Sequence, residues 1–143
     1  MKFSWKYYGN DEHNSVPLIV EYDAIRFIFN YYHLSLFYND YQNIENVYEN
    51  ISNQFGYKVK PPEGMVNSLA YTYLYFKQFV EDALYLFKLN VSNYPDSWKV
   101  YDSLGDYYDA TGDKANAIDN YKKALSIKED PDTRKMLEKL QGK

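Results

Sequence analysis

The chain has 143 residues, of which 45% are hydrophobic and 25% charged, with a formal net charge of −4. This length fits one domain with a real core, and the composition is too apolar for a disordered chain. The acidic balance and the lack of a Lys/Arg block argue against nucleic-acid binding, and the absence of cysteine excludes disulfides and thiolate metal sites.

The first predicted element is a strand at residues 2–8, KFSWKYY. Phe3, Trp5 and Tyr7 alternate with polar residues, which is the period-two pattern of a strand with one buried face. No apolar segment resembles a signal peptide or reaches the length of a membrane span. We therefore expect a soluble chain with no membrane partner and no targeting signal. The sequence does not determine the compartment, and an exported parent protein is among the alternatives.

Two helices are expected next, at residues 17–37 and 40–55. Pro17 is tolerated in a first helical turn, and apolar residues then recur at helical spacing. The second helix is expected to end at Gly56. The Pro-rich sequence KVKPP at residues 58–62 should then form a rigid, non-helical connection. The predicted apolar stripe of the second helix consists of Ile44, Val47, Tyr48, Ile51 and Phe55.

After the break the sequence repeats itself: Ala83 and Phe87 recur 34 residues later as Ala117 and Tyr121. That period is typical of stacked helix-turn-helix arrays. The pattern resembles the tetratricopeptide repeat (TPR), a family that forms superhelical arrays. The first matching unit is Val66-x-x-Leu69-Ala70-x-x-Tyr73, Ala83-x-x-x-Phe87 and Pro95. The second is Tyr101-x-x-Leu104-Gly105-x-x-Tyr108, Gly112-Asp113, Ala117-x-x-x-Tyr121 and Ala124.

Both units depart from the family pattern. The first has one extra residue in its inter-helix turn, and the second carries Glu129 where the closing proline would stand, with Pro131 two residues on. The last stretch, residues 130–141, resembles the solvating helix that ends such arrays, and we expect Met136, Leu137 and Leu140 to face inward.

The resemblance implies an all-α fold, with TPR-like helix-turn-helix repeats packed on the preceding helices and a short N-terminal strand remnant. Two repeats are few for a stable array, so the helices of residues 17–55 should supply the missing packing partner. The expected organisation is a strand and histidine loop at 1–17, two packing helices and a linker at 18–60, repeats at 61–128 and a capping helix at 129–143.

The front of the chain carries a second resemblance. The run FSWKYYGNDEHNSVPLIVEYDAIRFIF is similar to the end of an esterase-like α/β-hydrolase, where a late strand leads into the catalytic-histidine loop and the last large helix. The resemblance implies that His13 is the general base, catalytic only together with a hydrolase domain. In that fold the nucleophile and the acid precede the histidine, and this sequence has no Gly-x-Ser-x-Gly elbow.

Without this resemblance, a lone histidine in a turn is most often an exposed or capping residue. We expect no esterase activity from the chain alone. The apolar surface of residues 2–37 would then lack its cover, and self-association through these residues is the expected outcome, with a homodimer that pairs this surface with itself as one form of it.

The TPR resemblance also implies a concave binding groove, formed by the first helix of each repeat. Its predicted residues are Asn67, Tyr71, Tyr75, Asp102, Asp106 and Asp109. The three aspartates follow at helical spacing on one face, where like charges repel mildly. An acidic and aromatic groove of this kind fits a basic protein or peptide better than a C-terminal carboxylate. The alternatives are that the face is merely solvated or is covered by a missing domain.

No His, Asp or Glu spacing suits a metal site, and we expect no cofactor. The sequence thus favours a protein-interaction or architectural TPR module at the C-terminus of an esterase-like hydrolase. Two alternatives stay open: a free-standing TPR adaptor, and a complementing piece of a serine hydrolase that supplies His13.

Overall fold

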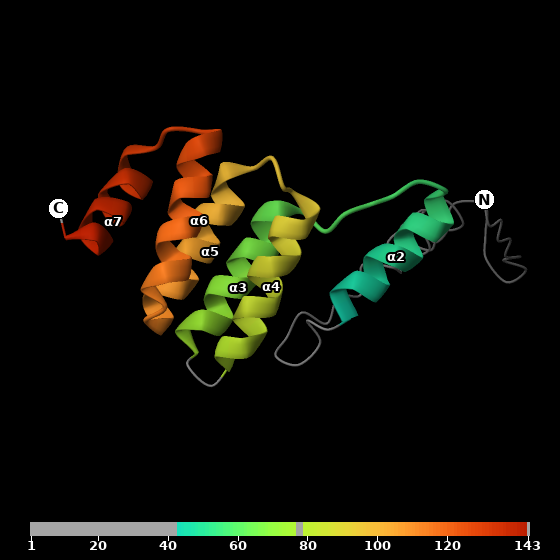
Figure 1. The fold of residues 1–143 in the computed structure, drawn as a ribbon. Helices are drawn as coiled ribbons and strands as arrows, with labels where there is room; N and C mark the ends of the chain where they lie inside the picture. The colour runs from blue at the N-terminus through green and yellow to red at the C-terminus, as the bar shows by residue number, and fades with distance from the viewer. Residues whose placement is uncertain (1–42, 77–78, 143) are drawn as a thin grey trace, which may run out of the picture. The chain divides into compact units, whose positions relative to one another are not determined.

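The computed structural model describes residues 43–76 and 79–142, and within these ranges the fold is all-α (Figure 1). The chain divides into two compact units, Met1–Lys60 and Pro61–Lys143. The predicted strand, the His13 loop, the helix at 17–37 and the surface expected to dimerise lie outside the described residues. They stay predictions, as does the packing of the early helices on the repeats.

The described helix of the first unit is α2, Ile44–Phe55. Ile44, Tyr48 and Ile51 are buried, as the predicted stripe requires. Phe55 at the end of the stripe is instead 49% exposed, and its ring packs against Tyr57 with the centroids 5.9 Å apart. The apolar face of α2 therefore ends one turn before the helix does.

The end of α2 is fixed by local contacts. Gly56 follows the helix in the left-handed conformation, with φ of 75°, which glycine adopts at little cost. The Ser52 hydroxyl donates to the Tyr48 carbonyl at 2.6 Å and accepts from the Val59 N–H at 2.8 Å. This hydroxyl holds the first residues of the linker against the last turn of the helix.

The second unit consists of five helices in its described part. They are α3 (Glu63–Tyr75), α4 (Val80–Asn93), α5 (Trp98–Thr111), α6 (Lys114–Ile127) and α7 (Pro131–Gln141). Helices α3 and α4 pack against each other, as do α5 and α6, while α5 also contacts α4 and α7 packs on α6 (Figure 1). The short connections make each pair antiparallel, so the prediction of two helix pairs and a terminal helix is confirmed.

Capping residues explain where α6 and α7 begin. Gly112 ends α5 at a φ of 84°, and the Asp113 carboxylate accepts from the Asn116 N–H at 3.2 Å at the start of α6. Asp130 accepts from two N–H groups of the first turn of α7, each at 3.1 Å, and Pro131 occupies that turn. These side chains satisfy backbone donors that a helix leaves unpaired at its N-terminus.

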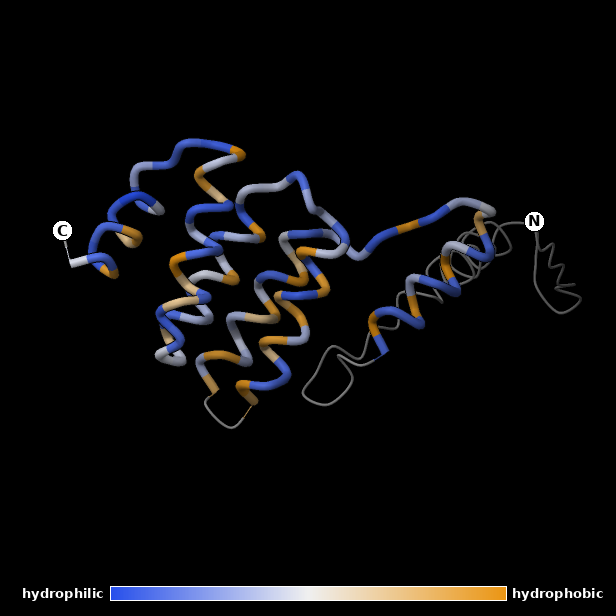
Figure 2. The backbone as a smooth tube through the Cα atoms, viewed as in Figure 1, coloured by the Kyte–Doolittle hydropathy of each residue, from blue (hydrophilic) through white to orange (hydrophobic). Residues whose placement is uncertain are grey.

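The core of the second unit consists of small and large residues that face each other between helices. Ala83, Phe87, Ala117 and Tyr121 are each at most 1% exposed, so both copies of the recurring pair are buried. Gly105 lies so close to the Tyr121 ring that a Cβ atom on it would come within 2.6 Å of Cε1. Figure 2 shows hydrophobic segments recurring along α3 to α6, separated by hydrophilic ones.

The terminal helix α7 differs from its prediction at one residue. Leu137 is buried and Leu140 is half-buried, but Met136 is 42% exposed. Adjacent helix positions are turned by about 100°, so Met136 cannot point toward α6 together with Leu137. Apart from these apolar residues α7 is mostly hydrophilic (Figure 2), as suits a helix that ends an array.

Candidate functional site

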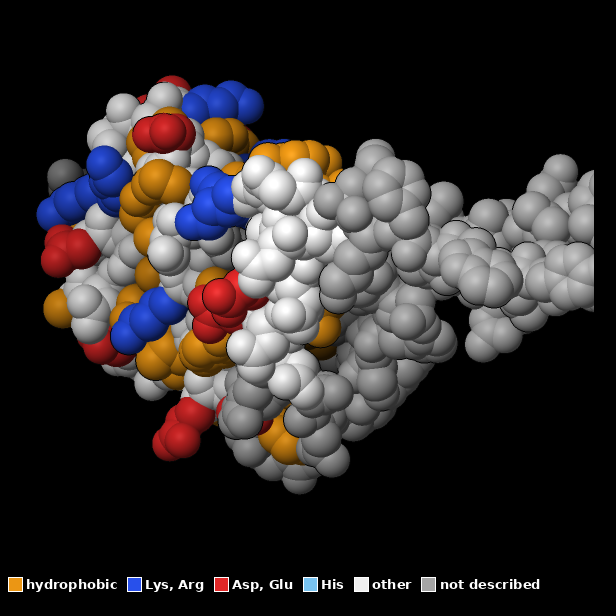
Figure 3. All heavy atoms as spheres, turned by 90° about the vertical axis from the view of Figure 1, so that its right-hand side faces the viewer, with side chains coloured by type: hydrophobic (Ala, Val, Ile, Leu, Met, Phe, Trp, Pro, Cys, Tyr) orange, Lys and Arg blue, Asp and Glu red, His pale blue; other side chains and the backbone are white. Residues whose placement is uncertain are grey.

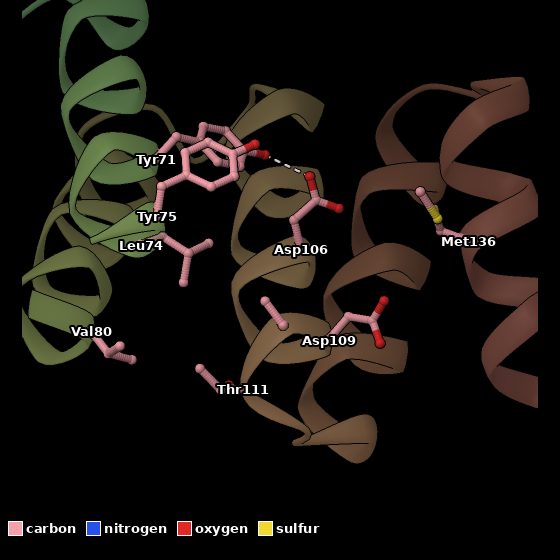
Figure 4. Close-up of a pocket in the computed structure, with 9 residues that line it drawn as sticks. Tyr71, Leu74, Tyr75, Val80, Asp106, Asp109, Thr111 and Met136 are labelled. Atoms are coloured by element: carbon pink, nitrogen blue, oxygen red, sulfur yellow. Dashed lines mark hydrogen bonds between the residues drawn. The ribbon is translucent and has the colours of Figure 1, made fainter. Parts of the chain in front are cut away.

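An open groove of about 770 Å³ lies across α3 and α5, the first helix of each pair in the second unit (Figure 4). Helices α3 and α5 form most of its walls, Val80 contributes from α4, and Met136 lies on the side of α7. The lining residues are Tyr71, Leu74, Tyr75, Val80, Asp106, Asp109, Ala110, Thr111 and Met136. Among the described residues the lining is thus largely apolar and aromatic, with two carboxylates and no basic residue.

Asp106 lies at the junction of three helices. Its carboxylate accepts from the Tyr71 hydroxyl of α3 at 2.6 Å and from the Tyr121 hydroxyl of α6 at 2.7 Å, one on each oxygen. Hydrogen bonds to an ionised acceptor are stronger than neutral ones. Asp106 therefore ties α3 and α6 to α5 and fixes one wall of the groove.

This arrangement changes the pKa of the two tyrosine hydroxyls. Burial raises the pKa of both the Tyr71 and the Tyr121 hydroxyl well above the ordinary range, and the hydrogen bond to Asp106 raises it further. In each case the ionised phenolate would have to sit in a poorly solvated place beside a carboxylate. Both phenols are thus held in the neutral, donating form.

This predicts a stability loss at alkaline pH. A group whose pKa is raised by folding contributes stability that is complete below its ordinary pKa, about 10 for tyrosine, and that is lost as pH rises through the folded value. We expect Tyr71→Phe to make the free energy of unfolding fall less steeply between about pH 10 and pH 11. Urea unfolding of both proteins across this range measures the slopes.

Tyr57→Phe is the matched control, because it removes one exposed phenol outside the cluster. If Tyr71→Phe leaves the alkaline slope as steep as in the wild type, the Tyr71 hydroxyl does not stabilise the fold through its neutral form.

Asp102 also has a structural partner. Its Oδ1 accepts from the Thr133 hydroxyl of α7 at 2.6 Å, and Thr133 is 2% exposed. Burial raises the pKa of Asp102, and the hydrogen bond from Thr133 partly offsets this effect. Asp102 does not line the groove. It connects α5 to α7 instead of facing a ligand.

Two predicted residues remain available in the groove. Asp109 makes no side-chain hydrogen bond or ion pair within residues 43–76 and 79–142. Tyr75 is 80% exposed, and its ring stacks on that of Tyr71 at 6.4 Å, with an interplanar angle of 28°. Tyr71 is held in turn by an edge contact with Phe87 at 5.1 Å. One ring thus rests on a fixed support and presents the rest of its surface to solvent.

Asn67 completes the predicted set but lies outside the groove lining. Its Oδ1 is buried and has no hydrogen-bond partner among the described residues. The structure therefore brings Tyr71, Tyr75, Asp106 and Asp109 together at the groove and leaves Asn67 and Asp102 aside.

Sequence reasoning missed the other residues of the groove lining, which are Leu74, Val80, Ala110, Thr111 and Met136. Leu74 follows Tyr71 by about one helical turn, and Ala110 follows Asp106 in the same way, so helical spacing could have found both. Nothing local marks Met136, because it reaches the groove only through the position of α7.

Other surface features are mixed in character. On the face shown in Figure 3, Lys and Arg side chains are interspersed with Asp and Glu among hydrophobic ones. None of the helices in the described part of the chain is long and apolar enough to cross a membrane.

No protein-family model matches the chain, and no curated protein matches its sequence. The relation to TPR proteins and to esterase-like hydrolases therefore stays a prediction from the motifs. His13 lies outside the described residues, and its suggested role stays with the second of these predictions.

Proposed function

We propose that the second unit, residues 61–142, is a protein-interaction module of the TPR kind that binds an extended segment of another protein in the groove. One observation carries this proposal: the groove exposes Tyr75 and Met136 although its walls are fixed. Exposed apolar side chains gathered in a concave surface are typical of binding sites.

The hydrogen bonds of Asp106 and Asp102 support the same function. They hold α3, α6 and α7 against α5 before any ligand arrives. A preformed site loses less conformational entropy on binding, so more of the contact energy appears as affinity. The two aspartates therefore serve the groove indirectly, as parts of its frame.

Selection from a phage-displayed library of random dodecapeptides tests the proposal. We expect peptides that bind the full chain and that lose at least about tenfold in affinity with Ala110→Trp, because the indole would fill the groove that an apolar anchor should occupy. Fluorescence anisotropy with the synthetic peptides gives the dissociation constants.

Ala115→Trp is the matched control, since Ala115 is an exposed alanine near the start of α6 and does not line the groove. Circular dichroism establishes that both variants are folded. Peptides that bind both variants as tightly as the wild type would place the interaction elsewhere and contradict the proposed function.

A further inference from the structure

The Thr133 hydroxyl, at the contact between α5 and α7, lies between two carboxyl groups. It is 2.6 Å from Oδ1 of Asp102 on α5 and 3.2 Å from Oδ1 of Asp130, the residue that caps α7. A hydroxyl has one hydrogen, so Thr133 can donate to only one of these oxygens at a time. Thr133 is 2% exposed, and water therefore has little access to the junction. Both contacts can be hydrogen bonds only when one of the carboxyl groups carries a proton.

Asp102 is the carboxyl group suited to carry this proton. Burial raises its pKa, and the hydrogen bond from Thr133 partly offsets this effect. The neighbouring carboxylates of Asp106, Asp130 and Asp132 raise the pKa of Asp102 further. The pKa of Asp130 is instead lowered, because its carboxylate accepts from the backbone N–H groups of Thr133 and Asp132. A proton on Asp102 can be donated to Thr133 Oγ1 while the Thr133 hydroxyl donates to Asp130.

The docked α7 supplies much of this environment. It places Thr133 against Oδ1 of Asp102, which excludes water there, and it brings the carboxylates of Asp130 and Asp132 near. Titratable groups on three other helices also interact with Asp102, and they are Asp106 of α5, Tyr71 of α3 and Tyr121 of α6. These three groups do not depend on α7 for their place in the chain. The docking of α7 and the binding of a proton by Asp102 therefore favour each other.

We propose that α7 is a proton-dependent wall of the groove: when Asp102 binds a proton, α7 is held more firmly against α5, and Met136 is held at the groove with it. This goes beyond the proposed function, because it concerns the attachment of α7 whatever the groove binds. Folding raises the pKa of Asp102 above its ordinary value. Its contribution to α7 docking is therefore complete below about pH 4 and is lost as pH rises through the folded value.

Amide hydrogen exchange of the full chain, followed by NMR, tests this proposal. Protection factors correct for the intrinsic effect of pH on exchange, and comparison with the amides of α4 corrects for changes in global stability. We expect the relative protection of the α7 amides to be at least about threefold higher at pH 4.5 than at pH 7. Asp102→Asn, whose side chain is neutral at both pH values, should abolish this difference.

Asp119→Asn is the matched control, since it removes an exposed carboxylate of α6 and should leave the difference unchanged. The carboxyl carbon resonance of Asp102 in the wild type is a second measurement that does not require the variant to fold. We expect it to titrate above about pH 4, the ordinary value of an aspartic acid. Titration at or below this value, equal relative protection of α7 at the two pH values, or an unchanged difference in Asp102→Asn would each overturn the proposal.

Discussion

Asp106→Ala should lower the free energy of unfolding by about 3 kcal/mol, because it leaves two tyrosine hydroxyls without their charged acceptor. Tyr121 is 1% exposed, so water cannot readily replace the lost partner. Tyr71 would lose the contact that connects α3 to α5 at this point. The substitution also removes the repulsion between the Asp102 and Asp106 carboxylates, which offsets only a few tenths of a kcal/mol of this loss. Urea unfolding followed by circular dichroism measures the difference.

Asp109→Ala is the matched control for this variant, since Asp109 lies one turn further along α5 and makes no side-chain hydrogen bond within the described residues. Its effect should stay within about 0.5 kcal/mol of the wild type. Equal effects of the two substitutions would mean that the tyrosine hydroxyls contribute nothing specific through Asp106. The pair of variants thus separates loss of charge from loss of the hydrogen-bonded junction.

Gly105→Ala should lower the free energy of unfolding by about 2 kcal/mol, although alanine is the better helix former by about 1 kcal/mol. The added Cβ would lie 2.6 Å from Tyr121 Cε1 and 2.7 Å from Cδ1. The Tyr121 ring cannot move aside easily, because it is buried and its hydroxyl is held by Asp106. The overlap therefore has to be relieved by separating α5 from α6.

Gly64→Ala should change the free energy of unfolding in the opposite direction in the same experiment. A Cβ at Gly64 would meet no atom within 4 Å, so the substitution should raise the free energy of unfolding by about 0.5 kcal/mol. Replacing Tyr121 by leucine should also reduce the cost of Gly105→Ala, since it removes the ring that the Cβ meets. A Gly105→Ala protein as stable as the wild type would contradict the close approach.

Local sequence signals determined where the helices of the second unit lie. The 34-residue recurrence of Ala83-Phe87 as Ala117-Tyr121 placed two buried pairs correctly, because helical spacing alone decides which side chains share a face. Gly112-Asp113 and the proline at 131 marked helix ends, since caps act over a few residues of backbone.

Long-range contacts decided the roles of the aspartates. The sequence puts Asp102, Asp106 and Asp109 on one helix face, and from spacing alone all three look equally free to bind a ligand. Asp106 finds its donors 35 and 15 positions away, and the donor to Asp102 lies 31 positions away. A hydrogen bond between helices depends on how they pack, and no local pattern encodes that distance.

The sequence by itself determined an all-α second unit with repeated helix pairs, because periodicity and capping are properties of neighbouring residues. Only the tertiary structure decided that two of the three aspartates frame the groove while Asp109 faces it, and that Met136 belongs to the groove instead of the core. The physical reason is the same in each case: burial and hydrogen bonding depend on what another helix places opposite a side chain.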